Sequence, residues 1–268
     1  MQLFKLGFYV ISFTSFLVWK FDVLYVYFFG NPIFMHTYLN RKTLLSSEKI
    51  ILKKEVSFYQ KLNNEEQLFF EHRLTEFIET YQFIGRGGYK VTSQTKVLIG
   101  SVYVMLTFGM RKYRTKVFNK IVVYPKQFHS KAHSRNHKGE FNFRYKTIVF
   151  SWEDFVQGVK VENDNLHLGI HEFTHSLSFH GKISRDYSAT VFNKIHKEII
   201  TYIKTPENVI KIKSKNYFRK YAFTNSLEFI AVMMEYFFES PIEFKKHFPE
   251  LYTKVVKMIN YKSFLNLQ

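Results

Sequence analysis

The segment that most constrains this chain is His-Glu-Phe-Thr-His at residues 171–175. On an α-helix, positions four apart lie on the same face, so His171 and His175 can present two imidazoles to one metal ion. Neutral imidazole is a favoured zinc ligand, with a Zn–N distance of about 2.0–2.1 Å. The segment therefore predicts a helix that carries a zinc-binding face.

Glu172 lies between the two histidines in sequence and points aside from them on the predicted helix. From that position its carboxylate can reach a zinc-bound water without binding the ion. Zinc lowers the pKa of such a water, and a neighbouring carboxylate can accept its proton as it attacks a peptide carbonyl. The pattern therefore predicts peptide-bond hydrolysis with Glu172 as general base. The alternative is a solvated helix that bears two unrelated histidines.

Two histidines leave a catalytic zinc short of its usual third protein ligand. His167 lies four residues before His171, but a straight helix seldom supplies three ligands on consecutive turns to one tetrahedral ion. We therefore expect His167 at the start of the helix, where it caps the helix or is solvated. His180 falls outside the longer pattern in which a third histidine follows the motif.

A better third ligand is Glu228, which is flanked by strongly apolar residues. A carboxylate in such surroundings is costly to bury unless it is paired or binds a metal. The alternative is a glutamate in the first turn of a helix that Asn225 or Ser226 caps, where the helix dipole favours it. Glu235 lies two turns further along the same face. It either orients a metal ligand from behind or pairs with a lysine.

The composition limits the class of protein. A chain of 268 residues that is 46% hydrophobic can bury a sizeable core, and the absence of cysteine excludes disulfides and thiol catalysis. The net charge of +17 is consistent either with a polyanionic partner or with a solvated basic surface. Lysine and arginine are scattered through the chain, which favours the solvated surface. No nucleic-acid-binding motif is present, so no specific nucleic-acid partner is expected.

The N-terminal segment is hydrophobic and aromatic. Residues 6–19 carry no charge, Lys20 and Asp22 follow, and residues 23–29 form a second apolar run. The first run is shorter than the roughly 20 residues of a spanning helix. The segment is a membrane anchor, a helix buried in the domain, or an interfacial segment. Its aromatic content favours membrane attachment through residues 1–35, with residues 36–268 as a catalytic domain on the cytoplasmic side. The other expected location is the cytoplasm.

Apolar spacing along the rest of the chain predicts mainly helices. Residues 85–88 are expected to form a turn, and the polar residues 129–137 a loop. Strands are predicted at 120–124 and 146–150, where β-branched residues cluster. The pattern is that of an α+β fold in which helices dominate. The predicted helices lie at residues 47–61, 63–80, 92–110, 163–179, 187–204, 226–239 and 242–260.

Several blocks of the sequence, in order between residues 55 and 260, resemble the MtfA-like zinc peptidases, also called the glucose-regulated metallopeptidase or M90 family. The resemblance implies a zincin-like fold of the gluzincin type. It implies that His171, His175 and Glu228 bind one Zn²⁺ per chain and that Glu172 is the base. Tyr221 would donate a hydrogen bond to the oxyanion of the tetrahedral intermediate, or it is simply one packed aromatic among 18 tyrosines. The blocks are residues 76–88, 106–109, 122–125, 139–140, 148–152, 171–175, 221–232 and 235–241.

The chain departs from this family at two places. Ser178 follows Leu177 where many relatives have aspartate, and the hydrophobic N-terminus is absent from soluble members. Family members show aminopeptidase-type activity, and one binds a transcriptional repressor. We therefore predict a zinc-dependent, aminopeptidase-like enzyme that acts on peptide substrates. The alternative is a regulatory module that keeps the zinc site and sequesters a protein partner such as a transcription regulator.

Overall fold

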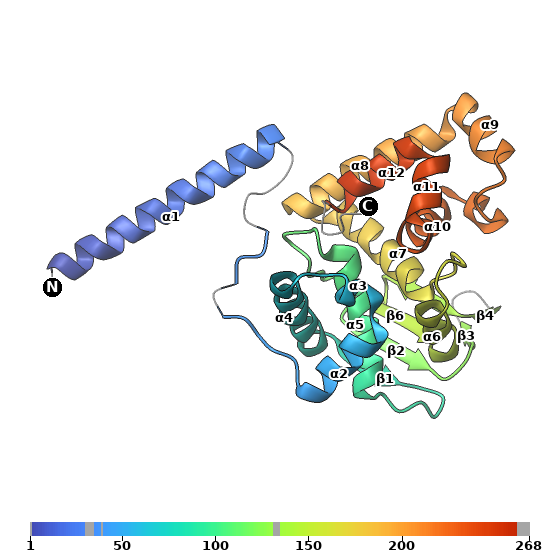
Figure 1. Cartoon of the computed structure of the whole chain (residues 1–268), viewed down its shortest axis with the longest axis horizontal. Coiled ribbons are helices and arrows are strands. Elements are labelled where there is room, and N and C mark those ends of the chain that lie inside the picture. Colours follow the sequence, from blue (N-terminus) through green and yellow to red (C-terminus); the bar gives the residue numbers. More distant parts are fainter. Residues whose placement is uncertain (1, 30–34, 39, 131–134, 262–268) are drawn as a thin grey trace. The chain divides into compact units, whose positions relative to one another are not determined.

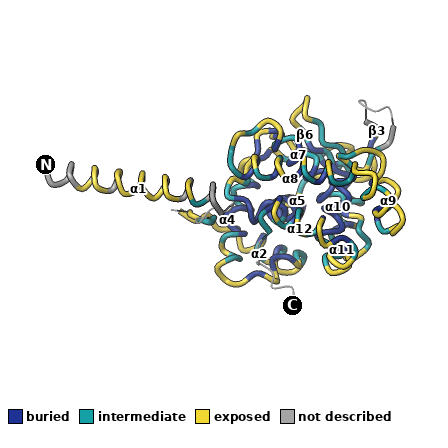
Figure 2. Tube along the Cα trace, turned by 90° about the horizontal axis from the view of Figure 1, so that it is seen from above, coloured by how far each residue is buried: buried dark blue, intermediate teal, exposed yellow. Residues whose placement is uncertain are grey.

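The computed structural model describes residues 2–29, 35–38, 40–130 and 135–261 (Figure 1). Contacts within the chain divide it into two units, residues 1–39 and residues 40–268. The first unit contains helix α1 (Gln2–Phe29), which joins the two apolar runs of the N-terminus into one helix. Taken by itself, α1 is coloured mostly as exposed in Figure 2. Its exposed apolar residues include Phe13 and Phe21.

Within the described residues, no helix combines the length and the apolar character that crossing a membrane requires. This result gives no support to the membrane attachment expected for residues 1–35.

The second unit contains a four-stranded mixed sheet in the order β1-β2-β6-β5. Strands β1, β2 and β6 are parallel, and β5 pairs antiparallel with β6 at one edge. In this register Gly139 of β5 lies opposite Phe150 of β6. A separate antiparallel pair is formed by β3 and β4. The strands are β1 (Gln82–Gly85), β2 (Lys120–Tyr124), β3 (Phe128–Ser130), β4 (Arg135–His137), β5 (Gly139–Asn142) and β6 (Thr147–Ser151).

Helices make up most of the second unit, and they cover the sheet and build a C-terminal layer (Figure 1). The helix-rich α+β class predicted from the sequence is thereby confirmed. The helices are α2 (Ser46–Glu55), α3 (Ser57–Gln60), α4 (Asn64–Thr80), α5 (Ser93–Thr107), α6 (Trp152–Lys160), α7 (Leu168–Ile183), α8 (Tyr187–Lys204), α9 (Pro206–Ser214), the 3₁₀ helix η1 (Lys220–Phe223), α10 (Ser226–Glu239), α11 (Pro241–His247) and α12 (Pro249–Met258).

Helices α7 and α10 both pack into the main hydrophobic core. Ile170 and Phe173 of α7 are buried there together with Ile230 and Met233 of α10. Figure 2 shows α5, α7 and α10 as largely buried elements. Because both helices are held by the same core, the side chains on their facing surfaces have fixed relative positions.

The strand predicted at 120–124 and the helices predicted at 187–204 and 226–239 are confirmed at both ends. The single helix predicted at 47–61 is wrong, because Val56 is extended and separates α2 from α3. The helix predicted at 242–260 is divided at Phe248, which precedes Pro249 and has a non-helical backbone with φ −138° and ψ 67°. Residues before proline are disfavoured in the α-helical region. The predicted loop at 129–137 overlaps β3 and contains β4, and β1, β5, α6 and α9 were not predicted.

The helix predicted from residue 163 begins later than expected. Asn163 and Asn165 have φ angles of 70° and 58°, so they form a left-handed turn and do not cap a helix. Helix α7 begins after His167. The turn therefore separates α6 from the helix that carries the histidine motif.

Candidate metal centre

His167 is the N-cap of α7. Its Nδ1 accepts a hydrogen bond from the backbone N–H of Ile170 at 3.3 Å, which satisfies one of the free donors at the start of the helix. Burial lowers the pKa of His167 to about 4, so its ring is neutral and can accept this bond. The expectation that His167 caps the helix is confirmed, but the side chain is buried and not solvated.

Asn225 is the N-cap of α10 and fixes the position of Glu228. Its Oδ1 accepts hydrogen bonds from the backbone N–H groups of Leu227 at 2.9 Å and Glu228 at 3.0 Å. Glu228 is therefore in the first turn of α10, where the helix dipole favours an acid. It also faces the two histidines of α7. Glu228 thus lies in the first helical turn, as one interpretation expects, and is close to the two histidines, as the other expects.

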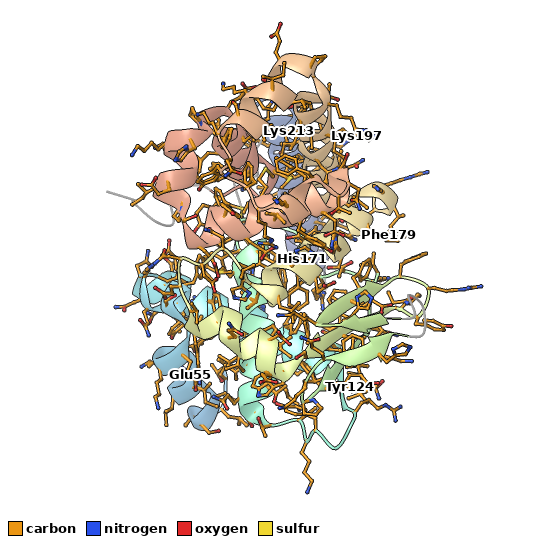
Figure 3. All side chains as sticks on the ribbon, turned by 90° about the vertical axis from the view of Figure 1, so that its right-hand side faces the viewer. Glu55, Tyr124, His171, Phe179, Lys197 and Lys213 are labelled. Atoms are coloured by element: carbon orange, nitrogen blue, oxygen red, sulfur yellow. The ribbon has the colours of Figure 1, made fainter. Side chains whose placement is uncertain are left out.

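Three potential ligand atoms converge where α7 and α10 meet. Nε2 of His171 lies 3.0 Å from Oε2 of Glu228 and 3.1 Å from Nε2 of His175. The remaining separation, between His175 Nε2 and Glu228 Oε2, is 3.5 Å. Figure 3 shows His171 at the junction of the sheet-containing region and the C-terminal helices.

These separations match the needs of a tetrahedral ion. Bonds of about 2.0–2.1 Å at tetrahedral angles place two ligand atoms roughly 3.3–3.4 Å apart. In addition, Oε2 of Glu228 is buried and makes no hydrogen bond of acceptable geometry. A buried carboxylate oxygen without a hydrogen bond is costly unless a cation binds it. His171, His175 and Glu228 therefore fit a metal ion.

The electrostatics of the centre also favour a cation. Burial alone would lower the pKa of His171, but the nearby carboxylates of Glu228 and Glu235 outweigh burial and raise it to about 10. Burial would raise the pKa of Glu228, yet the two histidines hold it well below its usual range. The cluster is thus stabilised by a positive charge between its donor atoms, whether a proton or a metal ion carries it.

Glu172 is buried beside the centre, against strand β5. Burial raises the pKa of its carboxyl group, which also makes a hydrogen bond with the backbone of Phe141. Space for the side chain depends on Gly139. A Cβ atom on Gly139 would lie only 2.8 Å from Cγ of Glu172 and 2.7 Å from Cδ1 of Leu168. A buried carboxylate with a raised pKa, next to a metal centre, is suited to accept and return a proton.

Tyr221 lies on η1, next to the first histidine. Its ring centroid is 5.9 Å from that of His171, and the side chain is 47% exposed. Tyr221, His171 and Glu172 together line a cavity of about 380 Å³. The hydroxyl-bearing ring is therefore at the cavity and not in the packed core.

Glu235 contacts the Nδ1 atom of His171, and Arg219 in turn binds Glu235. Oε1 of Glu235 lies 2.8 Å from Nδ1 of His171, and Oε2 accepts the backbone N–H of His167 at 2.8 Å. Arg219 donates to both oxygens, at 2.6 and 3.2 Å. Glu235 thus orients the ring of His171, a candidate metal ligand, and pairs with an arginine, where a lysine was the alternative. Arg219 carries no local sequence signal, because its partners lie on other elements.

His180 takes no part in this centre. Its Nε2 lies 3.1 Å from Oδ2 of Asp186, which caps the following helix α8. The exclusion of His180 from the ligand set therefore agrees with the structure.

Comparison with known proteins places the chain in a family. It is 22% identical over 240 residues to the uncharacterized protein slr2042 of Synechocystis sp. strain PCC 6803, and the match covers 81% of this chain and 84% of that protein. Residues 35–259 match the glucose-regulated metallo-peptidase M90 family. This span includes the histidine motif, Tyr221, Glu228 and Glu235. The chain therefore belongs to the glucose-regulated metallo-peptidase M90 family.

Proposed function

We propose that this protein is a zinc-dependent peptidase whose second unit has a zincin-like fold of the gluzincin type. One Zn²⁺ would be held by Nε2 of His171, Nε2 of His175 and a carboxylate oxygen of Glu228. The observation that carries the proposal is the spacing of these three atoms, between 3.0 and 3.5 Å, on two helices held by one core. Membership of a metallopeptidase family supports the same role.

When bound, zinc supplies Lewis-acid chemistry that acidifies a water molecule and polarises the substrate carbonyl. Proton transfer and the positioning of the metal ligands depend on the side chains of the protein. Glu172 accepts a proton from the attacking water and returns it to the leaving amine, and its raised pKa suits both steps. Glu235 keeps the hydrogen on Nδ1 of His171, so that Nε2 is free to bind the metal.

Tyr221 is proposed to stabilise the oxyanion. Its exposed ring lines the same cavity as Glu172, so its hydroxyl can reach a substrate bound there. A hydrogen bond that forms only with the negatively charged intermediate lowers the barrier without tightening substrate binding. The preference for the N-terminal end of short peptides rests on the family resemblance.

Two variants test the assignment. Purified chain should contain about one zinc per molecule and should hydrolyse fluorogenic peptides. Glu172→Gln should keep the zinc but lose activity by about 10²–10⁴-fold, because only the proton acceptor is removed. Glu228→Gln should lose the zinc, because the amide is a poor ligand.

Zinc-free protein after zinc-supplemented purification would disprove the metal site. An active Glu172→Gln variant would disprove the general base. A zinc-loaded wild type that cleaves no peptide would favour the alternative in which the site serves protein binding.

A further inference from the structure

A second cavity, of about 310 Å³, lies apart from the metal centre and shares no lining residue with the first cavity. It is bounded by the α2–α3 junction, α5, the end of α6 and the α10–α11 junction. Apolar side chains, among them Phe58, Val102, Met105 and Phe238, form much of its wall. An engineered apolar cavity of about 150 Å³ accommodates benzene, so this cavity has room for a small organic molecule.

One buried hydroxyl in the wall has no partner. Ser101 of α5 is 2% exposed, and its Oγ makes no hydrogen bond. A serine within a helix commonly bonds to the carbonyl four residues before it, but Ser101 does not. A polar atom of a ligand would satisfy this hydroxyl.

The charged residues of the second cavity are mainly acidic. Glu55, Glu162 and Glu239 line it together with one lysine, Lys61, although the whole chain carries a charge of +17. Figure 3 labels Glu55, at the end of α2. An acidic lining in so basic a protein favours a cationic ligand.

Among the acidic residues of the second cavity, Glu239 is the one that a bound cation would stabilise most. Its Oε2 accepts the backbone N–H of Leu166 at 3.1 Å. Within the part of the chain that the structure describes, its carboxylate forms no ion pair. Burial, followed by the charges of Asp164 and Glu235, raises the pKa of Glu239 to about 8. A bound ammonium group would stabilise the ionised form of this carboxyl group.

We propose that the second cavity binds a small organic amine, with its apolar body between α3, α5 and α10 and its ammonium group on Glu239. Neither an alcohol nor a carboxylic acid of the same size offers a charge that complements Glu239. The size and lining of the cavity suit a linear or ring-bearing primary amine of about six to ten carbons.

The second cavity is linked to the metal centre through the segment before α7. Asn163 and His167 line the second cavity, whereas Leu166 lines the first. Glu239 holds the backbone of Leu166, and Glu235, one turn earlier on α10, holds the backbone of His167 and Nδ1 of His171. An amine bound to Glu239 would therefore alter the hydrogen bonds that hold His171 in position. The affinity of the site for zinc would change as a result. This coupling rests on the proposed function.

Calorimetry on the full-length, zinc-loaded chain at pH 8.5 tests the binding site. Hexylamine, hexan-1-ol and hexanoate serve as probes of equal length. An alkaline pH favours the ionised form of Glu239, whose pKa is raised by burial, and a primary amine remains charged. Hexylamine should bind at least about tenfold more tightly than hexan-1-ol, as expected for a hydrogen bond to a charged group. Hexanoate, which the net charge of the chain attracts, should bind most weakly.

Glu239→Gln should remove the preference for the amine and leave the affinity for hexan-1-ol unchanged. Its matched control is Glu243→Gln, which removes the same charge from an exposed residue of α11 outside the cavity. No binding of hexylamine, equal affinity for the three probes, or an unchanged preference in Glu239→Gln would overturn the proposal. The comparison of probes on the wild type holds even if the variant folds poorly.

The coupling has its own measurement. Saturating hexylamine should change the zinc dissociation constant, measured against a chelator, by at least about twofold, and should not do so in Glu239→Gln. An unchanged constant with intact amine binding would overturn the coupling alone. Failure of the peptidase assignment would appear separately, in the zinc content of the wild type and in the Glu172→Gln variant.

Discussion

Nδ1 of His171 lies 2.8 Å from Oε1 of Glu235, while Nε2 of the same ring faces Glu228. The carboxylate thus fixes both the orientation of the ring and the position of its hydrogen. Arg219 holds that carboxylate with two hydrogen bonds. A supported imidazole binds a metal more tightly than a free one, because its orientation is set before the ion arrives.

Glu235→Gln should therefore weaken zinc binding by about 10–100-fold. The amide keeps the size of the side chain but loses the charge that Arg219 and His171 share. Competition with a chelator measures the affinity, and thermal unfolding shows whether the variant is folded. Glu198→Gln is the matched control, because the half-exposed carboxylate of Glu198 on α8 also pairs with a cation, Lys254. A folded Glu235→Gln variant with wild-type affinity would show that this contact is not used.

Tyr221→Phe should lower kcat by about 10²–10³-fold and leave KM and zinc content nearly unchanged. The substitution keeps the ring at the cavity and removes only the hydroxyl. Steady-state kinetics on a fluorogenic peptide separate kcat from KM. Tyr217→Phe provides the control, because its hydroxyl lies near Ser240, away from the cavity. Equal loss of kcat in both variants would refute a specific role for Tyr221.

Gly139→Ala should impair catalysis more than it impairs zinc binding. The new Cβ would collide with Glu172 and Leu168, so the carboxylate would have to move. A displacement of about 1 Å at a reacting group can cost about 100-fold in rate. Gly7→Ala is the control, since nothing lies within 4 Å of a Cβ at that position. If kcat for Gly139→Ala matches the wild type, the base is not held against β5 as described.

The fold should lose stability as the pH falls from about 6.5 to about 4. Burial lowers the pKa of both His167 and His196 to about 4 in the folded state. Between these pH values the unfolded chain binds a proton at each site and the folded chain does not, so protonation favours unfolding. Each histidine contributes up to about 3 kcal/mol to this loss.

His196→Leu should remove about one such contribution. His196 is remote from the candidate metal ligands in sequence, and its Nε2 is buried without a hydrogen bond, so leucine removes no hydrogen-bonding partner of that atom. Urea unfolding at pH 7 and pH 4.5 measures the difference, which should shrink by about 2–3 kcal/mol in the variant. An identical pH dependence in both proteins would mean that His196 is protonated in the fold.

The sequence is most informative where structure depends on near neighbours. Asn63 before α4 and Asn225 before α10 cap their helices as ordinary sequence patterns predict. The two histidines of α7 could be paired from their helical spacing alone. Glu228 could be singled out because a charge among apolar residues needs a partner. The local chemistry of these residues therefore indicated the ligand set before any tertiary contact was known.

Other features depend on contacts that no local pattern records. Strand β1 pairs with β2, and of its four residues only Gly85 fell within a predicted element, the turn at 85–88. Arg219 acquires its role only when η1 lies beside α10. The left-handed turn at Asn163 and Asn165 could not be distinguished from a helix cap, because asparagine is favoured in both.

The candidate ligands come from helices that are well separated along the chain, two from α7 and one from the start of α10. During synthesis the histidines leave the ribosome while α10 has yet to be made. A growing chain can therefore offer an ion only two of its three protein ligands. The chain can hold a metal ion tightly only after the C-terminal helices have docked. In the finished protein the ion would act as a clamp across that junction, so chelation should loosen α7 and α10 together.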